Sequence, residues 1–295
     1  MDKKKEILNI GGQAVIEGVM MRGKKVCYMS VRRPDGEIET VEEKFSFFSG
    51  KYKFFKLPIV RGVVSFIDAL ILGMRTLMKS AEISGTETED DKIPEYLFYI
   101  TGFIAVVISI GLFMLLPVWI SSVLNRFLQV RTMFIGVVEG LVRICLFLLY
   151  IFLMARMKDI RRVFEYHGAE HKTINCLESG GELSVDTVKT YSRLHKRCGT
   201  SFLLIVMIVS MVVFLFLRTD VVWLRFVSRI LLIPFIAGFS YEIIKWAGRN
   251  ESALVSIISY PGMALQKITT SEPDDKQIET AIAAVKEVLS RESEA

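Results

Sequence analysis

All three histidines of the chain, His167, His171 and His195, lie within one polar segment of 29 residues. The first two belong to an H-x-x-E-H sequence with Glu170 between them, and a helical turn brings positions i, i+3 and i+4 to one face. Two imidazoles placed in this way can bind one ion. Inverted zinc proteases show the same order of residues, with the glutamate as general base. The pattern predicts a metal site at His167 and His171 with Glu170 as the catalytic residue, and a surface helix with two histidines is the alternative.

A second pair of ligand types stands nearby, because His195 and Cys198 form an H-x-x-C sequence. Cysteine and histidine at short spacing in a reducing compartment are more often metal ligands than disulfide partners. All four side chains together would make a closed, structural site. Three of them plus water would make an open, catalytic one. We expect a divalent cofactor, zinc in the first place.

Glu242 is a further candidate ligand, because it ends an apolar segment 71 residues after His171. Inverted-motif metalloproteases take a distal glutamate as third ligand. The alternative is a salt bridge to Lys245 or Arg249 on the same helix.

Four glycines lie between Gly11 and Gly23, among small and apolar residues. They indicate tight turns or close backbone approach. The stretch lacks the Gly-Lys-Ser/Thr ending of a P-loop, so a phosphate cradle is not expected. We interpret it either as a tightly packed β-turn element or as a loop that contacts a substrate or partner through Gln13, Glu17 and Arg22.

An apolar fraction of 52% and a mean hydropathy of +0.41 are too high for an ordinary soluble protein of 295 residues. A bilayer-spanning helix needs about twenty mostly apolar residues. Leu57 to Met78 has this length but carries Arg61, Asp68 and Arg75, so we expect an amphipathic surface helix over 57–79. Four stretches qualify as spans: Tyr96 to Pro117, Met133 to Met154, Thr200 to Leu217, and Val222 to Ile244.

Basic residues concentrate on one side of these spans. Sixteen lysines and arginines precede the first span and nine lie between the second and third, whereas the other two connectors carry few. Loops rich in lysine and arginine stay in the cytoplasm. We therefore expect both termini and the connector with the histidines to be cytoplasmic. A net charge of +5, scattered in this way, does not indicate nucleic-acid binding.

Charged residues also occur inside the spans. Glu139 and Arg143 stand at i and i+4 in the second span, and Arg225 and Arg229 at i and i+4 in the fourth. Unpaired charge there is costly, so we expect this intramembrane charge cluster to place Glu139 against one of the arginines inside the bundle.

These elements predict a mainly α, polytopic membrane protein with about four transmembrane helices. An N-terminal cytoplasmic α+β region would contain a β-hairpin over Val26–Val31 and Glu37–Val41, and the chain would end in an amphipathic helix with Ile278, Ile282, Val285 and Leu289 at helical spacing. The expected segments are 1–56 (glycine-rich and hairpin region), 57–79 (surface helix), 96–154 (first transmembrane hairpin), 155–199 (His/Cys connector), 200–244 (second transmembrane hairpin) and 245–295 (cytoplasmic tail).

The sequence resembles the YqhQ-like family of bacterial multi-pass membrane proteins over nearly its whole length. The resemblance rests on Gly11 to Gly23, His167 to Thr173, His195 to Phe202 and Gln266 to Pro273. It departs at Lys196, where the family leads us to expect proline; this affects the local turn and leaves the ligands intact. The resemblance implies a bacterial cytoplasmic membrane protein and a metal-dependent enzyme with no established substrate.

Two functions follow as hypotheses. The first is a metal-dependent membrane enzyme, hydrolytic, with a site at the bilayer surface that acts on a membrane-associated substrate. The second is a non-enzymatic assembly or translocation factor, in which a closed His/Cys site holds the connector together. A channel or transporter is a third reading with little support, because internal charges are few and no internal repeat is evident.

Overall fold

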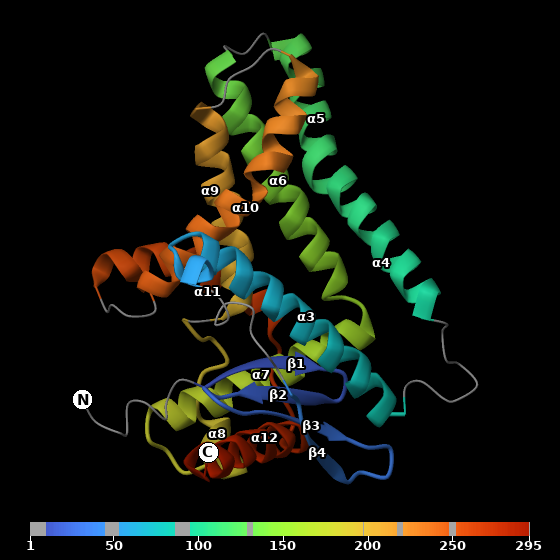
Figure 1. The fold of residues 1–295 in the computed structure, drawn as a ribbon, viewed down its shortest axis with the longest axis vertical. Helices are drawn as coiled ribbons and strands as arrows, with labels where there is room; N and C mark the ends of the chain where they lie inside the picture. The colour runs from blue at the N-terminus through green and yellow to red at the C-terminus, as the bar shows by residue number, and fades with distance from the viewer. Residues whose placement is uncertain are drawn as a thin grey trace.

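The computed structural model describes residues 10–44, 53–85, 95–128, 132–196, 198–216, 221–247 and 252–294. A bundle of apolar helices forms one end of the molecule, and a four-stranded sheet with its covering helices forms the other (Figure 1). We call this second part, made of β1–β4, α7, α8 and α12, the sheet module. Two helices, α3 and α11, lie across the boundary between the two parts.

The sheet is an antiparallel meander in the order β1-β2-β3-β4. Its second hairpin confirms the prediction, because β3 (Cys27–Arg32) pairs with β4 (Ile38–Glu42) around Gly36, whose φ is +92°. The glycine-rich stretch forms a first hairpin of β1 (Gly11–Val15) and β2 (Gly18–Arg22). The backbone of this stretch is therefore a β-turn element, as the first of the two interpretations expected.

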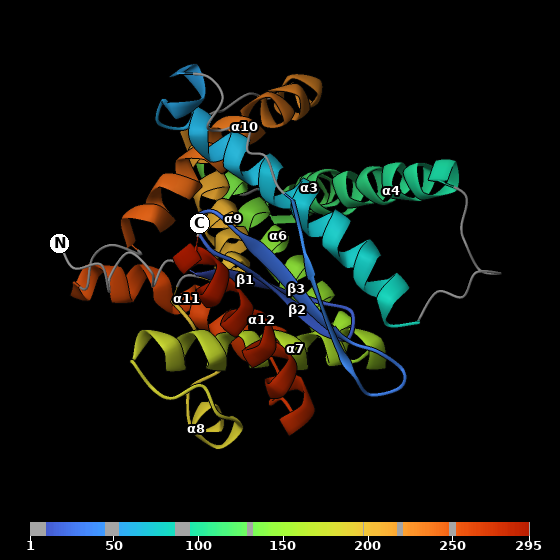
Figure 2. The same cartoon turned by 60° about the horizontal axis from the view of Figure 1, so that its bottom comes forward.

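Apolar side chains alternate between the two faces of the sheet. Val19 and Met21 of β2 face the core built with α7 (Lys158–Glu178) and α12 (Asp275–Glu294), both of which contact the sheet; α12 is seen over the strands in Figure 2. Met20 packs on the opposite face with Leu72 of α3 (Val60–Ile83). The short helix α8 (Val185–Lys189) adds Val188 to the first core.

Four helices of the described residues are long and apolar enough to cross a membrane, as expected. The second and third expected spans correspond to α6 (Thr132–Met154) and α9 (Gly199–Phe216), although Leu217 lies outside the described residues. The fourth corresponds to α10 (Val222–Ala247). The fold is a polytopic membrane fold.

The prediction for the first span was too short. The helix runs through α4 (Glu95–Ile110), a π-helical turn η3 (Gly111–Leu115) and α5 (Leu116–Leu128). The expected span ended at Pro117, a residue type that lacks the amide an α-helix needs and whose ring presses on the preceding turn. The wider π turn ends at Leu115, two residues before Pro117, and the helix continues through the proline.

Helix α3 confirms a helical segment where the surface helix was expected, preceded by a 3-10 turn, η1 (Lys53–Lys56). It is not among the four apolar spans. Its buried residues face the sheet and α10, and its opposite side exposes Ile67, Leu70, Ile71, Met74 and Met78.

The segment 245–295 holds two helices where the sequence suggested one. The expected amphipathic helix is α12. Before it, α11 (Ala253–Thr269) packs against α9 and continues through Pro261. Its buried Gln266 bonds to the chain beside His195, so this segment also supports the histidine connector.

The expected intramembrane ion pair is present. Glu139 accepts hydrogen bonds from Arg229 at 2.6 Å and from Arg143 at 3.0 Å. All three side chains are buried, and both guanidinium groups lie over the ring of Phe214. Arg225 lies in α10, but its side chain is outside the part that the structure describes. The cluster joins α6 to α10 across the bundle.

Candidate metal centre

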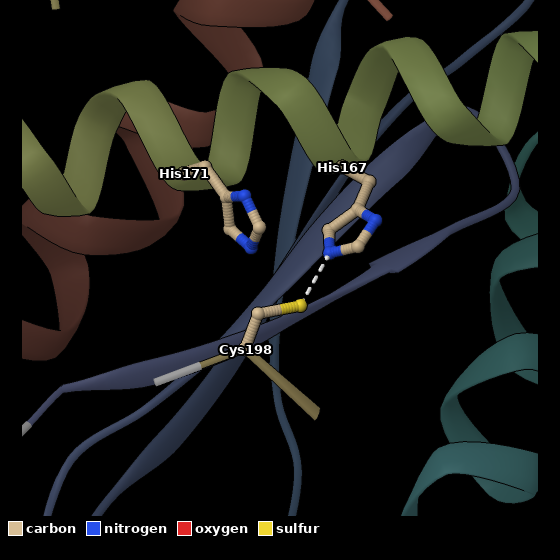
Figure 3. A group of neighbouring side chains, drawn as sticks. All are labelled: His167, His171 and Cys198. Atoms are coloured by element: carbon tan, nitrogen blue, oxygen red, sulfur yellow. Dashed lines mark hydrogen bonds between the residues drawn. The ribbon is translucent and has the colours of Figure 1, made fainter. Parts of the chain in front are cut away.

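The H-x-x-E-H sequence lies in the middle of α7, and its helical spacing puts the three side chains on one face as expected. The rings of His167 and His171 are 4.4 Å apart, centroid to centroid. Figure 3 shows both rings pointing from α7 toward Cys198, which precedes α9. The site therefore forms between the sheet module and the start of an apolar span.

His167, His171 and Cys198 form a group in which one ligand atom of each lies within 4.8 Å of the others. The Sγ of Cys198 is 3.3 Å from Nε2 of His167. Two atoms that bind one zinc ion tetrahedrally at about 2.0 and 2.3 Å lie roughly 3.5 Å apart, so this spacing suits a shared ion.

Backbone carbonyls orient both imidazoles. Nδ1 of His167 donates to the Thr269 carbonyl at 2.9 Å, and Nδ1 of His171 donates to the Arg193 carbonyl at 2.6 Å. In each ring the proton is therefore on Nδ1, and the lone pair of Nε2 is available to bind a metal ion. Metal-ligating histidines are characteristically held by such a bond from the other nitrogen.

The electrostatics suit neutral imidazole ligands. Burial, with His167 nearby, lowers the pKa of His171 to about 2, so this ring is uncharged at neutral pH. Burial raises the pKa of the Cys198 thiol, and an ion would have to displace its proton. Two nitrogens and one sulfur are a donor set that zinc accepts, and the residues therefore fit a divalent ion.

His195 lies beside this group, outside the three ligands. Its ring centroid is 5.7 Å from that of His171, and its Nε2 faces Oε2 of Glu178 at 3.4 Å. Burial lowers the pKa of His195 to about 4. The closed four-residue site is thus not formed. The structure brings together three ligand side chains, the number that leaves a position open in catalytic zinc sites.

Glu242 does not join the group, which corrects the expectation of a distal ligand. Its carboxylate accepts hydrogen bonds from the guanidinium of Arg61 on α3, one of them at 2.6 Å. The observed partner also differs from the alternative that the sequence suggested, because it is Arg61 and not Lys245 or Arg249 of the same helix. An arginine 181 residues away in the sequence captures the carboxylate, and only the folded chain brings the two together.

Glu170 lies between the two histidines and is 5% exposed. Burial raises its pKa to about 7, while the backbone amide of Gly12 donates to the carboxylate and opposes the rise. A Cβ on Gly12 would come within 2.8 Å of the Glu170 side chain. Glycine at this position therefore lets β1 approach the carboxylate closely.

A cavity of about 670 Å³ opens beside these residues. The glycine-rich hairpin forms one wall, with Gln13 and Arg22 in the lining, and α3 contributes Leu72. Glu17 is instead held outside this wall by Arg162, whose Nη2 is 2.6 Å from Oε2. Two of the three expected loop residues thus reach the cavity, together with His167, Glu170, His171, His195 and Cys198.

Several supporting groups were not predicted. The carbonyls of Arg193 and Thr269 orient the histidines, and backbone carbonyls carry no sequence signal. Gln266 binds both the amide and the carbonyl of His195 and also Ser201. A glutamine inside an otherwise apolar helical pattern was the available signal for it.

The proton on Glu170 gives a pH dependence with a definite sign. The native state holds this proton up to about pH 7, whereas the unfolded chain releases it near 4.5. The ion-free protein should therefore lose stability relative to Glu170→Gln as the pH rises between these values, by at most about 1.4 kcal/mol per pH unit. Melting of both proteins after chelation, from pH 4.5 to 8, measures the difference. A constant difference would contradict the buried, protonated carboxyl.

Gly168 has a packing role that its helix propensity does not suggest. A Cβ there would lie 2.0 Å from the Ser271 carbonyl oxygen, in the segment whose Thr269 carbonyl holds His167. We expect Gly168→Ala to cost about 1–3 kcal/mol of stability and to weaken metal binding. Gly102→Ala, in open space on α4, is the control and should not destabilise. Equal melting of the two variants would contradict the close contact.

The fold and the His/His/Cys group describe a polytopic membrane protein with a group of side chains compatible with a metal site. The chain belongs to the family described as "Protein of unknown function (DUF1385)", which matches residues 57–291.

Within that class it is similar to "Uncharacterized protein YqhQ" of Bacillus subtilis (strain 168). The two are 36% identical over 306 residues, which cover 99% of this chain and 96% of the relative. The family resemblance expected from the sequence is confirmed. No solved structure matches the chain.

Proposed function

We propose that this protein is a metal-dependent membrane hydrolase whose site acts on a membrane-associated substrate. The supporting observation is the position of three ligand side chains, His167, His171 and Cys198, at the wall of a cavity that Glu170 also lines. A closed structural site would fill its shell with protein ligands and would not need this space.

His167, His171 and Cys198 would hold the divalent ion, zinc in the first place. When bound, such an ion supplies Lewis acidity that polarises a substrate oxygen. Glu170 accepts a proton from water in the cavity and returns it to the leaving group. Its pKa of about 7 suits both steps at neutral pH.

The site belongs on the cytoplasmic side of the bacterial membrane. All parts of the sheet module, 10–44, 158–189 and 275–294, lie at one end of the bundle (Figure 1). These parts and their neighbours carry most of the basic residues outside the spans, and basic loops remain inside. With this orientation, the exposed apolar side of α3 would lie near the bilayer surface, where a membrane-associated substrate would be found.

Glu170→Gln tests the catalytic role. The amide keeps the size of the side chain but cannot accept the proton, so the variant should retain its ion and lose hydrolysis. The assay compares membranes of cells that express wild type, Glu170→Gln or His171→Ala, with lipids and new protein N-termini measured by mass spectrometry. Asp159→Asn, exposed at the start of α7, is the control.

Products absent from both site variants but present in wild type and Asp159→Asn would support hydrolysis. Identical product profiles for wild type and Glu170→Gln, with the ion retained in both, would contradict it. The assembly or translocation factor with a structural ion would then be the better account.

A further inference from the structure

Strand β1 forms one edge of the sheet, and no described strand pairs with its outer side. The direction of each backbone group follows from the register. The amide of Arg32 donates to the Glu17 carbonyl at 2.8 Å. Backbone hydrogen bonds alternate along a strand, so the odd-numbered residues of β2, Val19 and Met21, also bond to β3. Gly18, Met20 and Arg22 consequently bond to β1, where their partners are Val15, Gln13 and Gly11.

The remaining residues of β1 therefore direct their amides and carbonyls outward. Gly12 and Ala14 are these residues. Two neighbouring contacts agree with this alternation. The Gly12 amide reaches Glu170, and the Ile16 amide donates to Ser80 on α3 at 3.1 Å.

This outer edge borders the cavity of the candidate metal centre. Residues 10–14 all line the cavity, opposite Phe164, His167 and Glu170 of α7. Gly11, Gly12 and Ala14 have little or no side chain, so the backbone of β1 is accessible from the cavity. An outward-facing strand edge is a template for another extended chain, because its amides and carbonyls repeat at the spacing of a peptide.

We propose that the outer edge of β1 binds a peptide segment in extended conformation by strand addition, and that peptides are the substrate class of this site. The inference rests on the proposed hydrolase function. Five extended residues cover roughly 17 Å, about the length of β1. Because the Gly12 amide already bonds to Glu170, a bound segment would pair with the Gly12 carbonyl and with the amide and carbonyl of Ala14, and it would pass beside Glu170 and the three ligands. A phospholipid has no repeating amides to match this edge.

Hydrolysis of such a peptide balances without a further co-reactant. The oxygen of one water molecule forms a bond to the peptide carbonyl carbon, and the C–N bond breaks. Glu170 takes one proton from that water and delivers it to the leaving nitrogen, which departs as an amine. The other product is a carboxylic acid.

The binding test uses the full chain in detergent micelles, treated with chelator so that no peptide is cleaved. A pool of random, acetylated and amidated hexapeptides is equilibrated with the protein, and retained peptides are identified by mass spectrometry. The best of these is then N-methylated at each residue in turn. Strand addition predicts that methylation at alternate residues weakens binding by roughly fivefold or more and that methylation between them has little effect.

A protein variant tests the same contact from the other side. Ala14→Pro removes the outward amide and leaves the bonds to β2, a position where edge strands tolerate proline. We expect peptide affinity to fall at least about fivefold in Ala14→Pro and to remain in Ala14→Gly. If Ala14→Pro does not fold, the N-methyl series alone decides.

No retained hexapeptide, equal sensitivity at consecutive residues, or unchanged affinity in folded Ala14→Pro would overturn the inference. These outcomes are separable from the proposed function, because peptide binding is measured on the ion-free protein and ion binding is measured separately. If the protein binds an ion but the N-methyl series shows no alternation, the hydrolase proposal stands and the peptide inference is wrong. If the series shows alternation but the protein never binds an ion, the peptide inference stands and the metal-dependent hydrolase proposal is wrong.

Discussion

Replacing Glu139 by arginine is expected to lower the stability of the helical bundle by about 3–5 kcal/mol. The carboxylate is the acidic partner of both Arg143 and Arg229, and all three groups are buried. Glu139→Arg would place three guanidinium groups together away from water, where uncompensated charge is strongly destabilising. Thermal melting in detergent should show the loss as a large decrease in the transition temperature.

A charge exchange provides the matched control. Glu139→Arg combined with Arg229→Glu restores one acidic group opposite an arginine and should recover part of the lost stability. Unchanged melting of Glu139→Arg would show that the cluster does not hold α6 against α10. Failure of the exchange to recover any stability would show that the charges do not act as a pair.

His171→Ala is expected to weaken metal binding more than about 100-fold. Removing a residue that only orients a ligand typically costs 10–100-fold, and His171 is placed as a ligand itself. His195→Ala is the matched control, because this neighbouring buried histidine lies outside the three-residue group. Competition against a chromophoric chelator gives both affinities.

The two histidines should therefore separate clearly. Retained affinity in His171→Ala would remove this residue from the shell. An equal loss of metal affinity in His195→Ala would show that His195 is also a ligand. The site would then have four protein ligands, as in the closed alternative that the sequence allowed.

The histidine pair could be predicted because both residues belong to one helix, where spacing alone determines their common face. Cys198 could be suggested but not placed, since it lies outside α7 in the sequence and reaches the pair only in the folded chain. Glu242 shows the opposite case. Its spacing suited a ligand, but the guanidinium of Arg61 from a distant helix holds the carboxylate.

The apolar helices were predictable from length and hydropathy, which depend on the bilayer and not on tertiary contacts. The predicted end of the first span at Pro117 was too early, because a π turn that accommodates proline has no clear sequence pattern. Gly12 and Gly168 were visible as unusual glycines. The structural role of each glycine could not be predicted, because each one makes room for a residue from a remote segment. Gly12 makes room for Glu170, and Gly168 makes room for Ser271.

The most direct test of the metal centre combines elemental analysis of the detergent-purified protein, prepared without chelator, with X-ray absorption at the edge of the metal found. We expect close to one divalent ion per chain and a shell of two imidazole nitrogens at about 2.0 Å, one sulfur at about 2.3 Å and a further light atom. Absence of a stoichiometric metal, or a shell without sulfur, would contradict a centre built by His167, His171 and Cys198.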